Sequence, residues 1–323
     1  MNSINLLITG GAGFIGSNLV EHFLKEERVA LVRVLDDLSN GYYENIEEFE
    51  THPKFEFIQG DLCDYETCLK ACEGIDKISH QAALGSVPRS IENPILTNEV
   101  NIGGTLKLLY AAKEQGVDRV ILAFSSSTYG DHSELPKVEK RTGKPLSPYA
   151  VSKAAIEQYA DVFGSIYGLD WVGFRYFNIF GPKQNPYNPY AAVIPIFCKA
   201  FLEDREIIIN GDGETSRDFT FVENAILMNE LALFTTNREA LNQIYNGACG
   251  DQISLNQTVS MLKKISGKEI PIVYKPERIG DVRNSQADIS KAKNLLGYEP
   301  AVRFEEGLKK VYSWYENNLN SIP

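Results

Sequence analysis

The chain has 323 residues, of which 43% are hydrophobic and 23% charged, and its formal net charge is −11. This composition is typical of a soluble globular protein that is large enough for one α/β unit or two coupled domains. The negative charge argues against nucleic acid and anionic membranes as partners. Because no apolar run reaches the roughly 18 residues of a membrane span and no targeting segment is visible, we expect a cytoplasmic protein.

The first predicted elements are a buried strand over Ile4–Thr9 and a helix over Phe14–Glu26. Gly10, Gly13 and Gly16 give the pattern G-x-x-G-x-x-G at the turn between them. Glycines at this spacing allow a tight turn, close approach of the backbone to a pyrophosphate, and close packing of helix on strand. The helix N-terminus offers free N–H groups to phosphates. The pattern therefore predicts a dinucleotide site.

Carboxylates follow the next two predicted strands. Asp36 closes the strand over Val29–Asp36, where a carboxylate can hydrogen-bond the adenosine ribose and repel a 2′-phosphate, which favours NAD over NADP. A third strand over Phe55–Ile58 is followed by Asp61. That side chain either meets the adenine amine or caps the helix that starts near Tyr65, and the sequence leaves both readings open.

Strands and helices continue to alternate up to about residue 176, which predicts an α/β fold with a Rossmann-type doubly wound parallel sheet. The remaining strands and helices of this part are predicted over Lys77–His80, Arg119–Phe124, Trp171–Arg175, Tyr65–Ala71, Pro94–Gln115 and Pro148–Tyr167. We expect residues 1–177 to form the NAD-binding domain, to which some later segments return, and residues 178–323 to form mainly a smaller, mixed α/β substrate lobe. Its helices are predicted near Ala191–Glu203, Glu223–Phe234, Leu255–Ser266, Ile289–Leu295 and Phe304–Asn317.

Tyr149 and Lys153 lie four residues apart on a predicted helix and therefore project from one face. A free phenol has a pKa of about 10, and a nearby ammonium lowers the pKa by favouring the phenolate. Such a pair can remove a proton from a substrate hydroxyl near neutral pH. Tyr-x-x-x-Lys often arises by chance, but beside the glycine turn it predicts a dehydrogenase-type site. The five cysteines and four histidines are scattered, so no disulfide framework and no metal centre are predicted.

With these motifs assembled, the chain resembles an extended short-chain dehydrogenase/reductase, and within that group the nucleotide-sugar epimerases and dehydratases. The resemblance extends from the first strand to about Phe304 and rests on four further stretches, which are residues 125–130, 175–178, 212–219 and 280–283. The closest likeness is to the bacterial UDP-N-acetylglucosamine 4-epimerases, because of Leu84-Gly85-Ser86-Val87-Pro88-Arg89-Ser90 and Tyr190-Ala191-Ala192-Val193-Ile194-Pro195.

The resemblance implies a bound NAD, with Asn101 holding the catalytic helix and Tyr176 lining the nicotinamide pocket. Together with the glycine turn and the strand ends, the expected cofactor residues are Gly10, Gly13, Phe14, Ile15, Gly16, Asp36, Asn40, Asp61, Leu62, Gln81, Ala82, Ala83, Asn101, Tyr149, Lys153 and Tyr176. It also implies catalysis by Tyr149 and Lys153 with a serine that hydrogen-bonds the sugar O4. Ser125 is the first choice, and Ser126 and Ser127 stay open.

For the UDP-sugar substrate, the resemblance assigns the diphosphate to two arginines and the uridine ribose to an aspartate, and bidentate guanidinium groups suit the diphosphate. The expected substrate residues are Gly85, Ser86, Ser125, Asn178, Ala192, Val193, Arg217, Arg278, Asp281 and Ser285. A bulky tyrosine at the position of Ser285 restricts family members to plain hexoses, so a serine there implies room for an N-acetyl group. Gly85 and Ala192 are small neighbours that agree with this.

The implied reaction is reversible inversion at C4 of UDP-GlcNAc or UDP-GalNAc through a 4-keto sugar. Related dehydratases carry an Asp-Glu pair directly after the catalytic serine or threonine, whereas this chain has Ser126, Ser127 and Thr128 there and so lacks the general acid for elimination. One alternative is a uronate 4-epimerase acting on UDP-N-acetylglucosaminuronate or UDP-glucuronate, for which Arg89 is a candidate C6 cation. Another is a non-catalytic nucleotide sensor on the same fold. By fold-level analogy, the two long helices pair in a homodimer.

Overall fold

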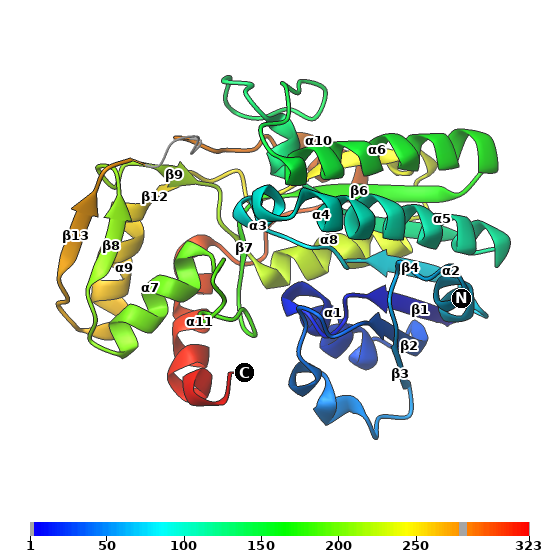
Figure 1. Ribbon diagram of the computed structural model, residues 1–323, viewed down its shortest axis with the longest axis horizontal. Coiled ribbons are helices and arrows are strands. Elements are labelled where there is room, and N and C mark those ends of the chain that lie inside the picture. The colour runs from blue at the N-terminus through cyan, green and yellow to red at the C-terminus, as the bar shows by residue number, and fades with distance from the viewer. Residues whose placement is uncertain (1–2, 278–282, 323) are drawn as a thin grey trace.

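The computed structural model of the protein describes residues 3–277 and 283–322, and its largest element is a seven-stranded parallel sheet (Figure 1). The strands follow the order β11-β6-β5-β4-β1-β2-β3. Their bounds are β1 Ile4–Thr9, β2 Val29–Asp36, β3 Phe55–Gln59, β4 Lys77–His80, β5 Arg119–Ser125, β6 Asp170–Tyr176 and β11 Gln243–Gly247. This arrangement confirms the predicted Rossmann-type α/β fold.

Helices cover both faces of the sheet, because parallel strands such as β1 are apolar on both sides. Leu6, Leu7 and Ile8 have no exposed surface, and successive side chains of the strand enter opposite core clusters. One face packs against α1 Phe14–Lys25, α8 Val222–Phe234 and α10 Ser290–Leu296. The other face packs against α2 Tyr65–Cys72, α5 Thr105–Glu114 and α6 Pro148–Tyr167. β11, α8 and α10 therefore return to the first domain from the second half of the chain.

A smaller lobe lies beside the sheet domain and is built on its own apolar cluster (Figure 1). Its helices are α7 Val193–Leu202, α9 Leu255–Ser266 and α11 Phe304–Asn318. Its strands form three short pairs, β7 Ile179–Phe180 with β10 Thr220–Phe221, β8 Ile207–Asn210 with β13 Ile272–Lys275, and β9 Ser216–Arg217 with β12 Ile253–Ser254. The lobe is mixed, since only the last of these pairs is antiparallel.

Three features of the sheet domain differ from the sequence expectations. A short helix, α3 Val87–Glu92, was not predicted, and it begins at Ser86, whose side chain accepts from the Arg89 N–H at 3.3 Å. The helix expected over Pro94–Gln115 consists of α4 Pro94–Asn98 and α5, joined by a π-helical turn over residues 99–104. The strand β11 was also missed. In the described part of the chain, no helix is both long and apolar enough to cross a membrane.

Candidate active site

The glycine turn between β1 and α1 leaves no space for side chains. A Cβ on Gly16 would lie 2.0 Å from the carbonyl oxygen of Gly10, and Gly10 itself has a φ of +67° with the Ala82 nitrogen 2.7 Å from its would-be Cβ. Helix α1 starts at Phe14 with no side-chain cap and no acidic residue in its first turn. The first N–H groups of a helix have no partner within the helix, so this end is open to phosphate oxygens.

A cavity of about 300 Å³ adjoins this turn at the carboxyl ends of β1 to β4. The predicted cofactor residues that line it are Gly10, Gly13, Phe14, Ile15, Gly16, Asp36, Asn40, Asp61, Leu62, Gln81, Ala82 and Ala83. The Gln81 Oε1 atom is buried there without a hydrogen-bond partner among the described residues. The chemistry of this cavity suits an adenine dinucleotide for three reasons. The glycine turn has no side chains, the Gln81 Oε1 atom lacks a hydrogen-bond donor among the described residues, and the carboxylates of Asp36 and Asp61 lie at the ends of two strands.

The two carboxylates are held by backbone groups. Asp36 accepts from the N–H groups of Ala12 and Leu38 at 2.9 Å each, and burial raises the pKa of its carboxyl against these two hydrogen bonds. Asp61 accepts from Cys63 N–H at 2.7 Å and lies on the cavity wall. The alternative that Asp61 caps the following helix is wrong, since Asp64 is the N-cap of α2 and accepts from Thr67 N–H.

Tyr149 and Lys153 begin α6 and occupy one face, with the Lys153 Nζ 5.9 Å from the centroid of the phenol ring. The ammonium is buried, donates to the Ala123 carbonyl at 2.7 Å, and has its pKa lowered to about 8 by burial despite the charge of Glu157. Burial raises the pKa of Tyr149, and a hydrogen bond with Ser125 opposes this. The pKa of the phenol is therefore raised overall, which is the opposite of the expected lowering.

The three serines differ in their surroundings. Ser125 ends β5, is 8% exposed, and its hydroxyl accepts from Ser127 N–H at 3.1 Å besides its bond with Tyr149. The Ser127 Oγ is buried with no partner among the described residues, whereas Ser126 is partly exposed. Ser125 is thus the serine that the structure brings to the phenol of Tyr149.

Helix α6, which carries Tyr149 and Lys153, is fixed from two sides. On one side, Asn101 in the π-helical turn donates to Ser152 Oγ at 3.0 Å and exchanges two hydrogen bonds with the backbone of Leu84. On the other, Glu157 forms a buried bidentate ion pair with Arg175, with both N–O distances at 2.8 Å. The first contact joins α6 to the loop that lines the cofactor cavity, as expected for Asn101.

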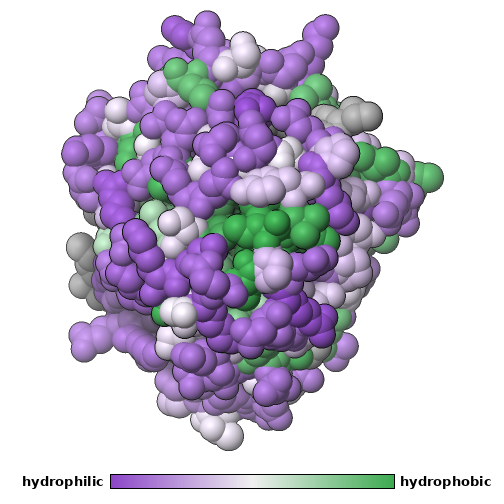
Figure 2. Space-filling model, turned by 90° about the vertical axis from the view of Figure 1, so that its left-hand side faces the viewer, coloured by the Kyte–Doolittle hydropathy of each residue, from purple (hydrophilic) through white to green (hydrophobic). Residues whose placement is uncertain are grey.

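A second cavity of about 330 Å³ lies in the smaller lobe. The predicted substrate residues on its wall are Asn178, Ala192, Val193 and Arg217. Arg217 Nη1 donates to the carbonyl oxygens of Ser216 and Arg283 at 2.9 and 3.3 Å. The space-filling view from the side of this lobe shows an apolar patch within a largely hydrophilic surface (Figure 2). Ile196 and Ile208 are exposed apolar residues of the lobe that also line this cavity.

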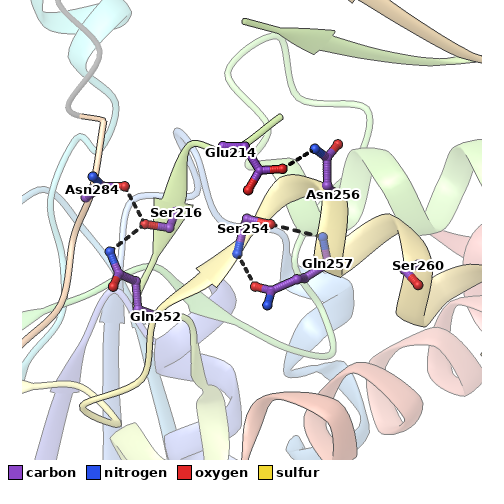
Figure 3. Close-up of a pocket in the computed structure, with 8 residues that line it drawn as sticks. All are labelled: Glu214, Ser216, Gln252, Ser254, Asn256, Gln257, Ser260 and Asn284. Carbon is purple, nitrogen blue, oxygen red and sulfur yellow. Dashed lines mark hydrogen bonds between the residues drawn. The ribbon is translucent and has the colours of Figure 1, made fainter. Parts of the chain in front are cut away.

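A third, open hollow lies on the other face of the β9–β12 ribbon, and its polar lining is paired internally (Figure 3). Ser216 Oγ accepts from Gln252 at 2.9 Å and donates to Asn284 Oδ1 at 2.7 Å. These contacts hold residues 283–285 alongside β9, where Ser285 N–H donates to Ser216 O at 3.2 Å. Side chains alternate along an extended segment, so Ser285 lies on the opposite face from Asn284. Ser285 and Arg217 therefore share one face.

The structure leaves some expected residues away from the cavities. Tyr176 ends β6 and accepts from Asn229 at 2.7 Å. The residues that line the cofactor cavity do not include Tyr176, Asn101, Tyr149 or Lys153. Ser285 lines neither cavity. Gly85 and Ser86 do lie at the cofactor side, and a Cβ on Gly85 would have no neighbour within 4 Å. Arg278 and Asp281 lie outside the described residues.

Sequence reasoning missed several wall residues, most of them apolar. In the lobe cavity these are Phe180, Ile194, Phe197, Phe219 and Leu255. Their only sequence signal is ordinary core-like hydrophobicity, which does not separate a ligand-facing side chain from a packed one. Arg89 was considered only as a possible C6 cation, and the structure places it on α3 beside the cofactor cavity, where its Nη2 donates to Asn40 Oδ1 at 2.8 Å.

Comparisons with known proteins agree with this architecture. A family model described as GDP-mannose 4,6 dehydratase matches residues 7–311. A putative UDP-glucose 4-epimerase from Methanocaldococcus jannaschii is 34% identical over 97% of this chain and 99% of its own length. The structure of a UDP-N-acetylglucosamine 4-epimerase from Methanobrevibacter ruminantium, in complex with UDP-N-acetylmuramic acid, has a TM-score of 0.92 at 37% identity and covers 98% of this chain and 100% of that chain.

A third comparison carries a cofactor. The UDP-glucuronic acid 4-epimerase from Bacillus cereus, in complex with UDP-glucuronic acid and NAD, has a TM-score of 0.90 at 32% identity, covering 97% of this chain and 99% of that chain. The parallel sheet, the glycine turn and the Tyr149–Lys153 pair define the fold and site of an extended short-chain dehydrogenase/reductase. Within that class, the chain belongs to the GDP-mannose 4,6 dehydratase family.

Proposed function

We propose that this protein is an NAD-dependent UDP-sugar 4-epimerase whose substrates are UDP-N-acetylhexosamines. The observation that carries the proposal is the cluster of Tyr149 and Lys153 at the start of α6 with Ser125 at the end of β5, in a chain that also has a dinucleotide cavity at the glycine turn and a lobe cavity lined by Arg217. The relatives above support the reaction class, because epimerases of UDP-glucose, UDP-N-acetylglucosamine and UDP-glucuronic acid are all similar along nearly the whole chain.

In the proposed mechanism, Tyr149 as phenolate removes the proton from the sugar 4-OH, and Ser125 holds O4 in place. NAD, when bound, supplies the acceptor that takes the C4 hydride and returns it to the opposite face of the 4-keto sugar. Lys153 stabilises the phenolate and holds the nicotinamide ribose. Arg217 keeps the diphosphate fixed while the sugar turns, so tight binding of UDP is combined with loose binding of the hexose.

The residues directly after Ser125 favour epimerisation over dehydration. Dehydration needs a general acid for the leaving hydroxyl. The turn over residues 126–129 carries two serine hydroxyls, a threonine and a tyrosine, and no carboxylate. The Thr128 hydroxyl donates to Ser125 O at 2.9 Å, and the Tyr129 hydroxyl donates to Asn246, so both act in the framework.

The choice of an N-acetylated sugar rests on space near the pocket. A Cβ added to Gly85 would have no neighbour within 4 Å. Ala192 lines the lobe cavity and the cavity that adjoins the cofactor site, and Ser285 has a small side chain. A uronate is the second candidate, and the similar Bacillus cereus enzyme supports it. It requires a cation near C6, and the nearby candidate Arg89 is instead directed to Asn40.

A homodimer completes the proposal. Helix α6 and its neighbours α3, α4 and α5 leave large apolar side chains exposed, among them Ile91, Ile95, Val151, Val162 and Ile166 at 43% to 72%. Val151, Val162 and Ile166 lie on one side of α6, since their spacings of eleven and four residues are close to whole helical turns. A second copy of this face is the occupant that we propose, with the helices packing as a four-helix bundle.

The function is tested by incubating the purified protein with UDP-GlcNAc, UDP-glucose and UDP-GlcNAcA and following C4 stereochemistry by NMR. We expect UDP-GlcNAc and UDP-GalNAc to interconvert fastest. Tyr149→Phe should lower the turnover number by about 100-fold or more while bound NAD is retained, because general base catalysis typically contributes that much. Tyr159→Phe, a partly buried tyrosine on the same helix, is the matched control. Equal turnover by Tyr149→Phe and the parent would contradict the mechanism.

A further inference from the structure

The cofactor cavity carries an imbalance of charge. Three carboxylates, those of Asp36, Asp37 and Asp61, lie on its wall, and no lysine or arginine of the described segments lines it. The pyrophosphate of a dinucleotide adds two negative charges to this surface. A helix N-terminus contributes roughly half a positive charge, which leaves most of the pyrophosphate charge without a counterpart.

An adjoining cavity of about 310 Å³ supplies the missing cation. It shares Gly13, Phe14, Asn40 and Gly85 with the cofactor cavity, so the two meet at the first turn of α1. Its basic residues are Arg89 and Lys183.

The two basic residues differ in how their charge is used. The Lys183 ammonium lies 3.7 Å from Glu21, 3.9 Å from Glu48 and 3.1 Å from the carbonyl oxygen of Asn45, so acidic groups already neutralise it. Arg89 forms no ion pair with any carboxylate in the described ranges 3–277 and 283–322. Its charge therefore stays available to a ligand.

Two contacts also fix the orientation of the Arg89 side chain. Its Nη2 donates to Asn40 Oδ1 at 2.8 Å, and its guanidinium lies over the ring of Tyr190 at 5.0 Å from the centroid. The Tyr190 hydroxyl donates in turn to Glu92, one turn along α3. These contacts leave donors of the planar guanidinium unused, and a guanidinium pairs well with two phosphate oxygens.

We propose that Arg89, positioned by Asn40 and Tyr190, binds the pyrophosphate of the dinucleotide cofactor. Asn40 follows β2 in the cofactor domain, whereas Tyr190 belongs to the loop before α7, so the Arg89 guanidinium contacts both the cofactor domain and the segment that leads into the lobe. The inference rests on the proposed NAD dependence. It also removes Arg89 from the C6 position that a uronate substrate requires.

The test measures NAD binding directly and needs no substrate. NAD is titrated into the stripped parent, Arg89→Gln, Arg89→Lys and Arg141→Gln, and tryptophan fluorescence gives the dissociation constants. Arg141 is an exposed arginine paired with Glu134, so its variant makes the same charge change away from the cavity. We expect Arg89→Gln to weaken NAD binding at least about tenfold, Arg89→Lys to retain most of the affinity, and Arg141→Gln to match the parent.

Salt separates a charge effect from a packing effect. Added NaCl should weaken NAD binding to the parent more steeply than to Arg89→Gln, because screening acts on the guanidinium–phosphate pair. Unchanged NAD affinity in a folded Arg89→Gln overturns the proposal, and so does an equal salt dependence in both proteins. If Arg89→Gln loses only turnover of UDP-GlcNAcA, the residue contacts a substrate carboxylate and the proposal is wrong. Absence of UDP-sugar epimerisation with normal NAD binding would refute the proposed function alone.

Discussion

At the scale of single residues, the central question for the proposed mechanism is how Tyr149 would become a base. Burial raises the pKa of its phenol and lowers that of the Lys153 ammonium to about 8, because both charged forms lose solvent. Near neutral pH, Lys153 is still mostly protonated, so it can stabilise a phenolate. In the proposed mechanism, the positive charge of bound oxidised NAD would act in the same direction, which would couple formation of the base to occupancy of the cofactor site.

Ser285 tests the proposed substrate at the same scale. Ser285→Tyr adds a bulky ring on the Arg217 face of the segment beside β9. If that ring fills the space for the C2 substituent, UDP-GlcNAc turnover relative to UDP-glucose should fall about tenfold or more, since overpacking a formed site typically costs 1–3 kcal/mol. Steady-state kinetics with both substrates measure this. Ser285→Ala keeps the space and should keep the ratio, and an unchanged ratio in Ser285→Tyr would refute the gate.

Individual residues were predictable where local geometry determines their role. The spacing of Gly10, Gly13 and Gly16 predicts a turn without room for side chains. The structure agrees, because a Cβ added to Gly10 or Gly16 would lie less than 3 Å from neighbouring atoms. The placement of Tyr176 against Asn229 was not predictable, because it depends on α8, which packs under the sheet from the second half of the chain. Arg89 was ambiguous for the same reason, as its partners Asn40 and Tyr190 are far away in the sequence.

At the scale of elements, periodicity predicted the long helices and buried strands well. The strand β11 was missed because it pairs only with β6 and its residues Gln243–Gly247 lack a run of apolar side chains. The π-helical turn over residues 99–104 was missed because one extra residue in a turn leaves no mark in the apolar pattern. Asn101 lies in that turn and reaches Ser152 on α6, so the irregularity serves the site.

A buried carboxylate connects the segments around the lobe cavity. Asp218 has no exposed surface and accepts from the N–H groups of Cys249 and Gly250 at 3.0 Å and of Ala287 at 3.1 Å. Burial raises the pKa of its carboxyl from the usual 3.8 to about 7, and these hydrogen bonds only partly oppose the rise. Burial at this position therefore costs the folded protein least when the carboxyl is protonated.

Asp218→Asn tests this linkage. In the parent, the contribution of Asp218 to the free energy of unfolding is fully present below pH 4 and is lost as the pH rises through about 7, because the unfolded carboxyl ionises first. The amide cannot ionise, so urea unfolding of the variant should lack this part of the decline between pH 4 and 7. Asp204→Asn, an exposed carboxylate paired with Lys268, should decline as the parent does. The same decline in Asp218→Asn as in the parent would disprove the role.

At the scale of the whole molecule, the proposed catalysis requires a fixed relative position of the sheet domain and the smaller lobe. The parallel strands direct their carboxyl ends to one edge, and the smaller lobe lies beside that edge (Figure 1). Residues 283–288 pass from β9 to the loop after Ser125, Ser126 and Ser127. There, Lys137 N–H donates to Gln286 O at 2.7 Å and Asp288 N–H donates to Lys137 O at 2.9 Å. The segment beside Arg217 is thereby joined to the loop that leads into α6.

The proposed dimer is the last test at this scale. Ile95 and Ile166 are 72% and 70% exposed on α4 and α6, which pack against each other, and neither has a role in the site. Two charges in an apolar dimer interface remain unpaired and desolvated, so Ile95→Glu/Ile166→Glu should raise the dimer dissociation constant by at least about 100-fold. Sedimentation velocity over a range of concentrations measures this. Tyr274→Glu changes an exposed aromatic residue on β13 of the other lobe and should remain dimeric. A parent that is monomeric at micromolar concentration, or a double variant that stays dimeric, shows that this face is not the interface.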